Sequence, residues 1–254
     1  MKMTRKLIPA FVMLIVSAIM LSTASYAWFA NSTKVTASGM TVKANTDVKF
    51  LQISTSNESN ATWGPSANVD PIEKNLDLNL VHAKVAEEKT VTWYTANAAD
   101  PDKPNADVDG LKNVDNISTA NAALIKTFYV KMSSENSSLT NLKLTNVEVT
   151  NNDSMLAPAL RVLVIAKDSK DVVQGVQVWD VGDSESDPVE TAGIVDEGDI
   201  NSSDVLVASI SGGAVYTLDV YIYFDGEDAR AYTDRVANAS LVKEQAVTLT
   251  FSGE

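Results

Sequence analysis

The sequence contains no cysteine and only one histidine, His82. Without cysteine the chain can have no disulfide, cysteine nucleophile, iron–sulfur cluster or thiolate zinc site. A single imidazole also excludes most metallohydrolases and most Ser-His-Asp chemistry. His82 lies between apolar residues in LVHAKV, outside any HExxH pattern, and we interpret it as a structural or surface histidine. The sequence therefore favours a protein that is not an enzyme, with no catalytic residue, cofactor or small-molecule substrate assigned.

Basic residues are outnumbered by acidic ones. The chain has 20 Lys and Arg against 33 Asp and Glu, which gives a formal net charge of −13. Such a surface would be repelled by phosphate backbones, so we expect no nucleic-acid partner. Hydrophobic residues make up 45% and charged residues 21% of the chain, values typical of a folded globular protein.

The N-terminus has the parts of an export signal. The opening MKMTRK is positively charged, and residues 7–21 are apolar except for one serine. Ser25 and Ala27 are small residues at the −3 and −1 positions of a signal-peptidase site. This pattern predicts cleavage before Trp28, with signal peptidase as a transient partner.

An uncleaved membrane anchor is the alternative, because no charged residue occurs between Lys6 and Lys34. The polar residues that end the apolar stretch favour cleavage. We therefore expect a signal peptide over 1–27 and one mature domain over 28–254, located outside the cell or on its surface.

The mature region is rich in segments that predict β-strands, with Val, Ile, Thr, Tyr and Phe between turns of Asn, Asp, Ser and Gly. The predicted strands are Lys34–Ala44, Val48–Ser54, Lys89–Thr95, Ile125–Ser133, Leu139–Thr150, Ala159–Asp168, Val172–Val181, Val205–Ile210, Ala214–Phe224 and Gln245–Ser252. Leu139–Thr150 alternates between apolar and polar residues with one slip near Asn146, which indicates a sheet with one wet face. Leu160–Ile165 and Val215–Phe224 are more continuously apolar and predict central strands.

Helix signals are few. Candidates are Pro71–Val81, Glu227–Asn238 and a short segment near Thr119–Leu124. About ten short strands separated by turns predict an all-β fold, a jelly-roll-like β-sandwich with one or two short helices.

Clusters of acidic residues are the remaining candidates for site chemistry. One cluster, DGED at 225–228, follows an apolar strand, and another, DEGD at 196–199 with Asp204, lies in a loop. Carboxylates are ligands that Ca²⁺ prefers, but neither cluster has EF-hand or nonapeptide spacing. We interpret both as solvated turns and assign no metal.

Trp28 and Phe29 lie directly after the expected cleavage site. Chain termini are usually frayed and polar, so two large aromatic residues before a β-patterned stretch need a place to be buried. Three interpretations fit these residues. The two aromatic side chains pack on their own domain, or they form the end of a membrane span, or the stretch is a strand that is donated to another subunit. The residues alone leave these alternatives open.

Two stretches of the chain resemble a known group of proteins. The first reads STASYAWF over 22–29 and VTASGMTV over 35–42, and the second reads VYIYFDGED over 220–228. They are similar to secreted surface and biofilm-matrix fibre proteins of the camelysin/TasA type from Gram-positive bacteria. The resemblance implies a jelly-roll subunit of an extracellular fibre, whose freed N-terminal segment completes the sheet of the next subunit. Camelysin is described as a metalloprotease, but this chain has no zinc motif, so that activity is not carried over.

Residues 28–44 are therefore the candidate donor strand. We expect the following residues to form its buried side: Trp28, Phe29, Val35, Ala37, Met40 and Val42. A neighbour's strand fills the apolar groove and pairs the open backbone edge of an incomplete sandwich. Burial of each large apolar side chain would contribute roughly 1.5–3 kcal/mol. Because donor and acceptor surfaces differ, the contact is head-to-tail and propagates into a filament.

The expected function is thus a secreted structural subunit of an extracellular fibre or biofilm matrix, with copies of itself or related matrix subunits as partners. The alternative is a monomeric cell-surface adhesin or carbohydrate-binding sandwich, which is Ca²⁺-dependent if its acidic loops bind the ion. Such a module would bind through the loops at 97–110 and 182–204. An enzyme of the camelysin kind ranks third, because catalytic residues are missing.

Overall fold

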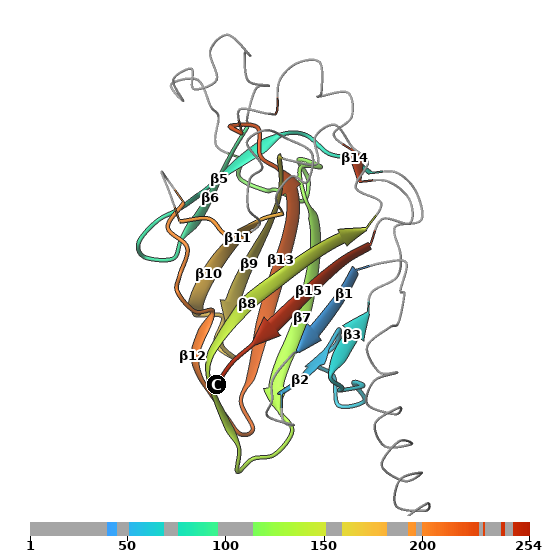
Figure 1. Cartoon of the computed structure of the whole chain (residues 1–254), viewed down its shortest axis with the longest axis vertical. Coiled ribbons are helices and arrows are strands. Elements are labelled where there is room, and N and C mark those ends of the chain that lie inside the picture. Colours follow the sequence, from blue (N-terminus) through green and yellow to red (C-terminus); the bar gives the residue numbers. More distant parts are fainter. Residues whose placement is uncertain are drawn as a thin grey trace, which may run out of the picture. The chain divides into compact units, whose positions relative to one another are not determined.

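Alternating and continuously apolar segments form β-strands in a computed structural model of the protein (Figure 1). The structure describes residues 40–44, 51–68, 76–95, 114–150, 159–181, 193–196, 200–228, 231, 240–241 and 246–254. These residues all belong to one compact unit, Ala37–Glu254, and contain no α-helix. Within them, no helix has the length and apolar character needed to cross a membrane. The predicted export segment, 1–27, lies outside the described residues.

The first of two large sheets has five strands. In spatial order they are β12 (Val207–Ser211), β8 (Ser138–Thr150), β15 (Ala246–Ser252), β1 (Met40–Ala44) and β3 (Ser66–Asn68). Neighbouring strands are antiparallel, except that β1 and β15 run parallel. The slip predicted near Asn146 is confirmed, because the register of β8 against β15 shifts at Thr145. The Thr145 hydroxyl donates a hydrogen bond to the Thr250 carbonyl at 3.1 Å across this bulge.

The second large sheet has six strands, and its neighbouring strands are all antiparallel. In spatial order they are β11 (Gly193–Ile194), β10 (Val173–Asp180), β9 (Leu160–Lys167), β13 (Val215–Phe224), β7 (Leu124–Met132) and β2 (Leu51–Ser54). The two segments predicted as central strands form β9 and β13, in the middle of this sheet, which confirms the prediction.

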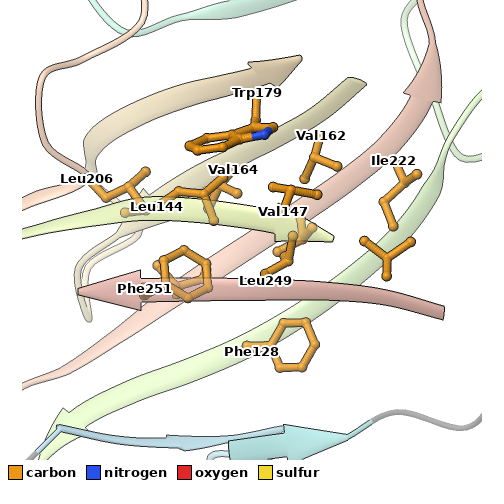
Figure 2. Close-up of a cluster of buried hydrophobic side chains, with 14 of the residues drawn as sticks. Phe128, Leu144, Val147, Val162, Val164, Trp179, Leu206, Ile222, Leu249 and Phe251 are labelled. Carbon is orange, nitrogen blue, oxygen red and sulfur yellow. The ribbon is translucent and has the colours of Figure 1, made fainter. Parts of the chain in front are cut away.

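The two sheets pack around a shared apolar core (Figure 2). Alternate side chains of both sheets enter it, for example Leu144 on β8, Leu249 on β15, Phe128 on β7 and Val164 on β9. Burial of alternate residues from two facing sheets is the packing of a β-sandwich. The all-β sandwich class expected from the sequence is confirmed.

A second apolar cluster lies on the other face of the six-stranded sheet. The hairpin of β5 (Val81–Val85) and β6 (Val91–Thr95) covers it. Trp93 of β6 packs on Tyr221 and Tyr223 of β13, with ring centroids 5.5 and 5.0 Å apart. Since successive residues of a strand point to opposite faces, β9 contributes to both clusters, which explains its continuous apolar sequence.

The helix predicted over Pro71–Val81 is wrong in its described part. Residues 76–77 form β4 (Leu76–Asp77), which pairs with β14 (Ser240–Leu241). Leu78 and Leu80 are buried whereas Asn79 is exposed. The buried leucines therefore follow the two-residue period of an extended chain. Residues two positions apart would not lie on the same face of a helix.

The short helix predicted near Thr119–Leu124 is also absent, because turns lead directly into β7. The Asn116 side chain accepts hydrogen bonds from the backbone nitrogens of Ser118 and Thr119 and so favours a turn over a helix interior. The helix predicted over Glu227–Asn238 lies mostly outside the described residues.

Candidate functional site

β1 is the C-terminal end of the predicted donor strand, 28–44, and it is inserted between two strands of its own sheet (Figure 1). Its five residues pair in parallel with Val247–Phe251 of β15. On its other edge, residues 41–43 pair antiparallel with β3. β1 therefore supplies backbone partners to two strands that would not otherwise be neighbours.

The register of this pairing matches apolar positions. Each apolar residue of β1 stands opposite a residue of β15 as follows: Met40 opposite Val247, Val42 opposite Leu249, and Ala44 opposite Phe251. The three β15 residues are all buried in the sandwich. In the pairing register, the apolar positions of β1 therefore stand opposite core positions of β15.

Two of the predicted donor residues, Met40 and Val42, thus lie in β1, which pairs within its own chain. The other four, Trp28, Phe29, Val35 and Ala37, lie outside the described residues. Donation to a second chain consequently requires either that residues 28–39 act alone or that β1 leaves this position.

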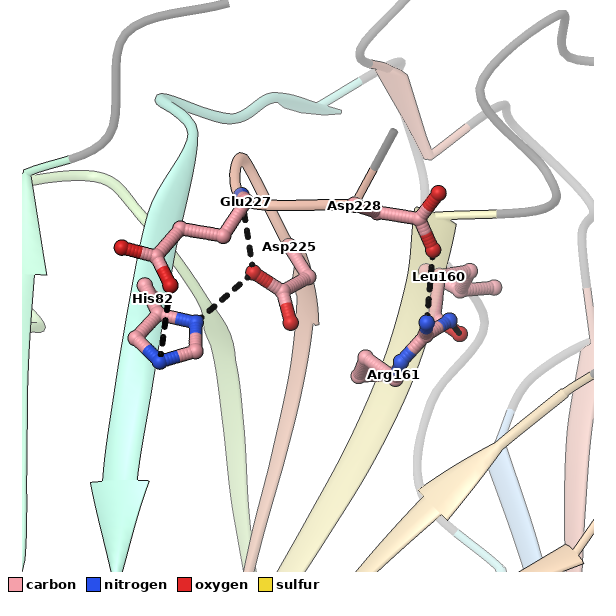
Figure 3. Close-up of polar contacts among 6 residues, drawn as sticks. All are labelled: His82, Leu160, Arg161, Asp225, Glu227 and Asp228. Atoms are coloured by element: carbon pink, nitrogen blue, oxygen red, sulfur yellow. Dashed lines mark hydrogen bonds and ion pairs between the residues drawn. The ribbon is translucent and has the colours of Figure 1, made fainter. Parts of the chain in front are cut away.

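The acidic turn that follows β13 is tied to two other parts of the fold (Figure 3). The Asp225 backbone nitrogen donates to the Ala159 carbonyl at 2.8 Å, and that of Gly226 donates to the Val81 carbonyl at 3.1 Å. The Glu227 backbone nitrogen donates to Asp225 Oδ1 at 3.1 Å, which closes the turn on itself. The backbone of the turn is therefore held beside Val81 of β5 and beside Ala159, which precedes β9.

His82 of β5 lies between two of these carboxylates (Figure 3). Its Nδ1 is hydrogen-bonded to Asp225 Oδ1 at 3.0 Å, and its Nε2 lies 3.3 Å from Glu227 Oε2, an ion-pair distance. The side chains of His82 and Asp225 are each 7% exposed. The single histidine thus joins the β5–β6 hairpin to the turn after β13.

Burial alone would lower the pKa of His82, because it disfavours the charged imidazolium. The hydrogen bond to Asp225 and the negative charges of Asp225 and Glu227 raise the pKa. The positive charge of the nearby Lys84 lowers it, as burial does. Together these contacts raise the pKa of His82 above its ordinary value of 6.5. By linkage, the resulting stabilisation is fully present below pH 6.5 and is lost as the pH rises through the raised pKa.

Arg161 of β9 lies at the same end of the six-stranded sheet, with its side chain 9% exposed. Its Nη1 lies 3.0 Å from Asp180 Oδ1, and its Nη2 lies 2.6 Å from Asp228 Oδ2. Nη1 also donates to the Leu160 carbonyl at 3.3 Å. Two carboxylates thus compensate one buried guanidinium, and each charge depends on the others because burial is costly for an uncompensated ion.

These contacts engage the three carboxylates of the predicted cluster at 225–228 with cations of the chain itself. In the part of the chain that the structure describes, no group of three or more His, Asp or Glu side chains is arranged to hold a metal ion. In the second acidic cluster, Asp196 and Asp204 are exposed, and residues 197–199 lie outside the described residues. The acidic residues at 225–228 therefore form ion pairs within the fold, and the prediction that they only fill a solvated turn is wrong.

No protein-family model, curated protein or solved structure matches the chain. The function proposed below therefore rests on the residues of this chain, on the geometry around β1, and on the resemblance of the two ends of the sequence described above.

The cluster around His82 and Arg161 is missed by sequence reasoning because its members are far apart. His82 and Asp225 are 143 positions apart, and Arg161 and Asp228 are 67 positions apart. One local signal exists: Arg161 interrupts the apolar segment LRVLVI, and arginine is rarely buried unless it is paired. That signal indicates an ion pair without naming its acidic partner.

Proposed function

We propose that this protein is a secreted structural subunit of an extracellular fibre or biofilm matrix, and that subunits assemble head-to-tail by exchanging the N-terminal strand. One observation carries the proposal. The first described strand, β1, is inserted between β15 and β3 and pairs with both. A β1 from a second copy would find the same backbone partners in the same position, which is the basis of exchange between identical chains.

The position beside β15 suits a strand from another chain. Without β1, the edge of β15 would be open, and an open strand edge readily pairs with a second chain. Each backbone hydrogen bond formed there contributes about 0.5–1.5 kcal/mol net. The apolar positions Met40 and Val42 stand opposite the buried Val247 and Leu249, so the register also fits the core.

Exchange of this strand gives each subunit one donor and one acceptor. Because these surfaces differ, successive subunits join head-to-tail and form a filament unless the chain of contacts closes. Residues 28–39 would enter the junction together with β1 and would bring Trp28, Phe29, Val35 and Ala37 with them. The chain has no cysteine, so strand pairing and apolar contacts would have to hold the junction.

The export signal supports the same function. Cleavage before Trp28 would free the N-terminal stretch outside the cell, where a matrix subunit assembles. The resemblance of both chain ends to camelysin/TasA-type proteins points in the same direction. The expected partners are copies of this chain or related matrix subunits, with signal peptidase acting during export.

Electron microscopy and sedimentation velocity of a protein comprising residues 28–254 test the proposal. We expect filaments, because every subunit then carries both donor and acceptor. Deletion of 28–38, or the double substitution Trp28→Ser and Phe29→Ser, should shorten or abolish them.

Lys34→Ser is the matched control, because it alters the same stretch without removing an apolar residue. This variant should assemble like the parent protein. A strict monomer at high concentration would contradict the proposal and would favour the monomeric adhesin.

A further inference from the structure

The β5–β6 hairpin is a separate two-stranded sheet that is attached to the rest of the fold at both of its ends. At one end, Val81 forms a bridge with Asp225. At the other end, the Val85 carbonyl accepts hydrogen bonds from the backbone and side-chain nitrogens of Asn201, at 3.3 and 2.6 Å. Between these ends the hairpin rests on the apolar cluster that contains Trp93. A change at one end can therefore alter how firmly the hairpin is docked.

His82 stands at the first of these attachments, where its Nδ1 is hydrogen-bonded to Asp225 and its buried Nε2 lies 3.3 Å from Glu227 Oε2 without a hydrogen bond. A neutral imidazole has one N–H group, so its other nitrogen would direct a lone pair toward a carboxylate. Imidazolium keeps the hydrogen bond to Asp225 and carries a positive charge that the nearby Glu227 carboxylate also attracts. The two carboxylates beside the ring therefore favour the protonated form of His82.

Other charged or titratable groups around the ring come from its own strand and from neighbouring strands. Lys84 on β5 disfavours the imidazolium. Arg161 on β9 shares the field of Asp225 but is compensated by Asp180 and by the last carboxylate of the turn. Tyr223 on β13 stays neutral, because burial and the charge of Asp225 raise its pKa well above its ordinary range. The two carboxylates in contact with the ring are thus the groups that decide its charge.

We propose that His82 is a pH-dependent clasp that holds the β5–β6 hairpin on the six-stranded sheet. In the imidazolium form, it joins β5 to both carboxylates of the turn after β13. When the proton leaves, Nε2 faces Glu227 without a hydrogen, the clasp weakens, and the hairpin spends more time undocked. Undocking exposes the apolar cluster under Trp93. This device is independent of strand exchange.

Hydrogen–deuterium exchange across a pH series, corrected for the intrinsic pH dependence of exchange, tests the clasp. Protection of β5 and β6 is compared with that of β9, which serves as an internal reference. In the wild-type protein, this ratio should fall by up to about tenfold per pH unit. The fall should begin near pH 6.5 and end above the raised pKa of His82.

Three variants separate a clasp from a merely structural histidine. His82→Gln cannot titrate and should remove the pH dependence of the ratio, and Glu227→Gln should move the fall to lower pH. Glu88→Gln changes an exposed carboxylate in the hairpin turn and should behave like the wild type.

Because the chain has one histidine, the imidazole NMR signals of a tag-free protein report its titration directly. A midpoint above 6.5 is expected. A flat protection ratio in the wild type, or a wild-type slope in His82→Gln, would overturn the proposal. If His82→Gln fails to fold, the NMR titration and the Glu227→Gln profile decide the question.

Discussion

The two faces of the six-stranded sheet are buried in different ways. The inner face packs on the five-stranded sheet through side chains that are almost all apolar (Figure 2). The outer face is covered by a two-stranded hairpin, and at its end the charged side chains of His82 and Arg161 are buried among carboxylates (Figure 3). A two-stranded hairpin is marginal on its own, whereas two large sheets bury ample apolar area. The β5–β6 hairpin therefore depends more than the five-stranded sheet does on specific polar contacts at its end.

β9 displays both kinds of burial within one strand. Val162 and Val164 belong to the inner core, while Leu163 and Ile165 belong to the outer cluster. Arg161 lies on the outer side, at the end of the strand where the acidic turn follows β13. Substitutions on the inner side should therefore act on the whole fold, whereas substitutions on the outer side should act locally and through charge.

The largest effect is expected for Phe251→Ala on the inner side. Phe251 is fully buried in the sandwich core. Its truncation should lower the free energy of unfolding by about 3–5 kcal/mol, through lost apolar burial and a cavity. Urea unfolding measures this loss, and hydrogen exchange should show β9, β13 and β15 losing protection together. Loss of protection confined to β15 would show that an inner substitution acts only locally.

Arg161→Met should have the next largest effect. The substitution keeps much of the side-chain volume but leaves Asp180 and Asp228 without their guanidinium. We expect a loss of about 3 kcal/mol in the free energy of unfolding. The double variant Arg161→Met, Asp228→Asn should recover part of it, because one buried charge is also removed. A loss below about 1 kcal/mol would place this pair with exposed salt bridges.

Added volume should also be costly on the inner side. A Cβ at Gly175 of β10 would lie 2.4 Å from the Val205 carbonyl oxygen and 2.6 Å from that of Leu206. Backbone atoms cannot move aside as a side-chain end can, so Gly175→Ala should cost about 1–3 kcal/mol. At Gly193 a Cβ would meet nothing within 4 Å. Gly193→Ala is therefore the control and should leave the urea midpoint nearly unchanged.

Stability on the outer side should depend on pH in a way that inner substitutions do not. The raised pKa of His82 means that its contribution is complete below pH 6.5 and is lost as the pH rises through the raised value. The difference in unfolding free energy between the wild type and His82→Gln should therefore shrink as the pH rises through that window. Phe251→Ala should differ from the wild type by the same amount throughout. Parallel profiles for both variants would contradict this distinction.

The smallest effect is expected at the ion pair between Lys167 on β9 and Asp219 on β13. Lys167 Nζ lies 2.6 Å from Asp219 Oδ2, but the Lys167 side chain is 27% exposed. Solvent screens such a pair, so Lys167→Met should change the free energy of unfolding by less than about 1 kcal/mol. A larger loss would show that ion pairs stabilise this face even where they are not buried.

Much of the fold could be predicted because each strand is a local pattern. The segments over β7, β8, β9, β10, β13 and β15 are recognisable from apolar alternation or from continuous apolar runs. The segment before β5 is mistaken for a helix, because its leucines are judged by composition and their two-residue spacing is overlooked. The short strands β3, β11 and β14 have two or three residues each, too few to carry a period.

The candidate sites could be predicted only in part, since they depend on distant pairings. The N-terminal apolar stretch is visible in sequence, but nothing local indicates that Met40 stands opposite Val247. Likewise, the acids at 225–228 resemble a solvated turn until the fold brings His82 and Arg161 beside them. Tertiary structure determines these contacts, and they cannot be predicted from the periodicity of the sequence.

Disulfide trapping between two different chains tests the exchange of β1 most directly. The chain has no cysteine, and Thr41 of β1 stands opposite Thr248 of β15. Neighbouring strands lie about 4.8 Å apart, which is within the reach of a disulfide. A Thr41→Cys copy is mixed with a Thr248→Cys copy under assembly conditions and then oxidised. Lys143→Cys, an exposed position on β8, replaces Thr248→Cys in the control mixture.

If β1 is exchanged, a covalent species with one chain of each kind will form and will increase with assembly, and the control mixture will not produce it. A double variant that carries both cysteines would then form disulfides within single chains while it is monomeric and between chains once it has assembled. Disulfides confined to single chains of the double variant, with no mixed species under any assembly condition, would show that β1 stays in its own sheet and would contradict strand exchange.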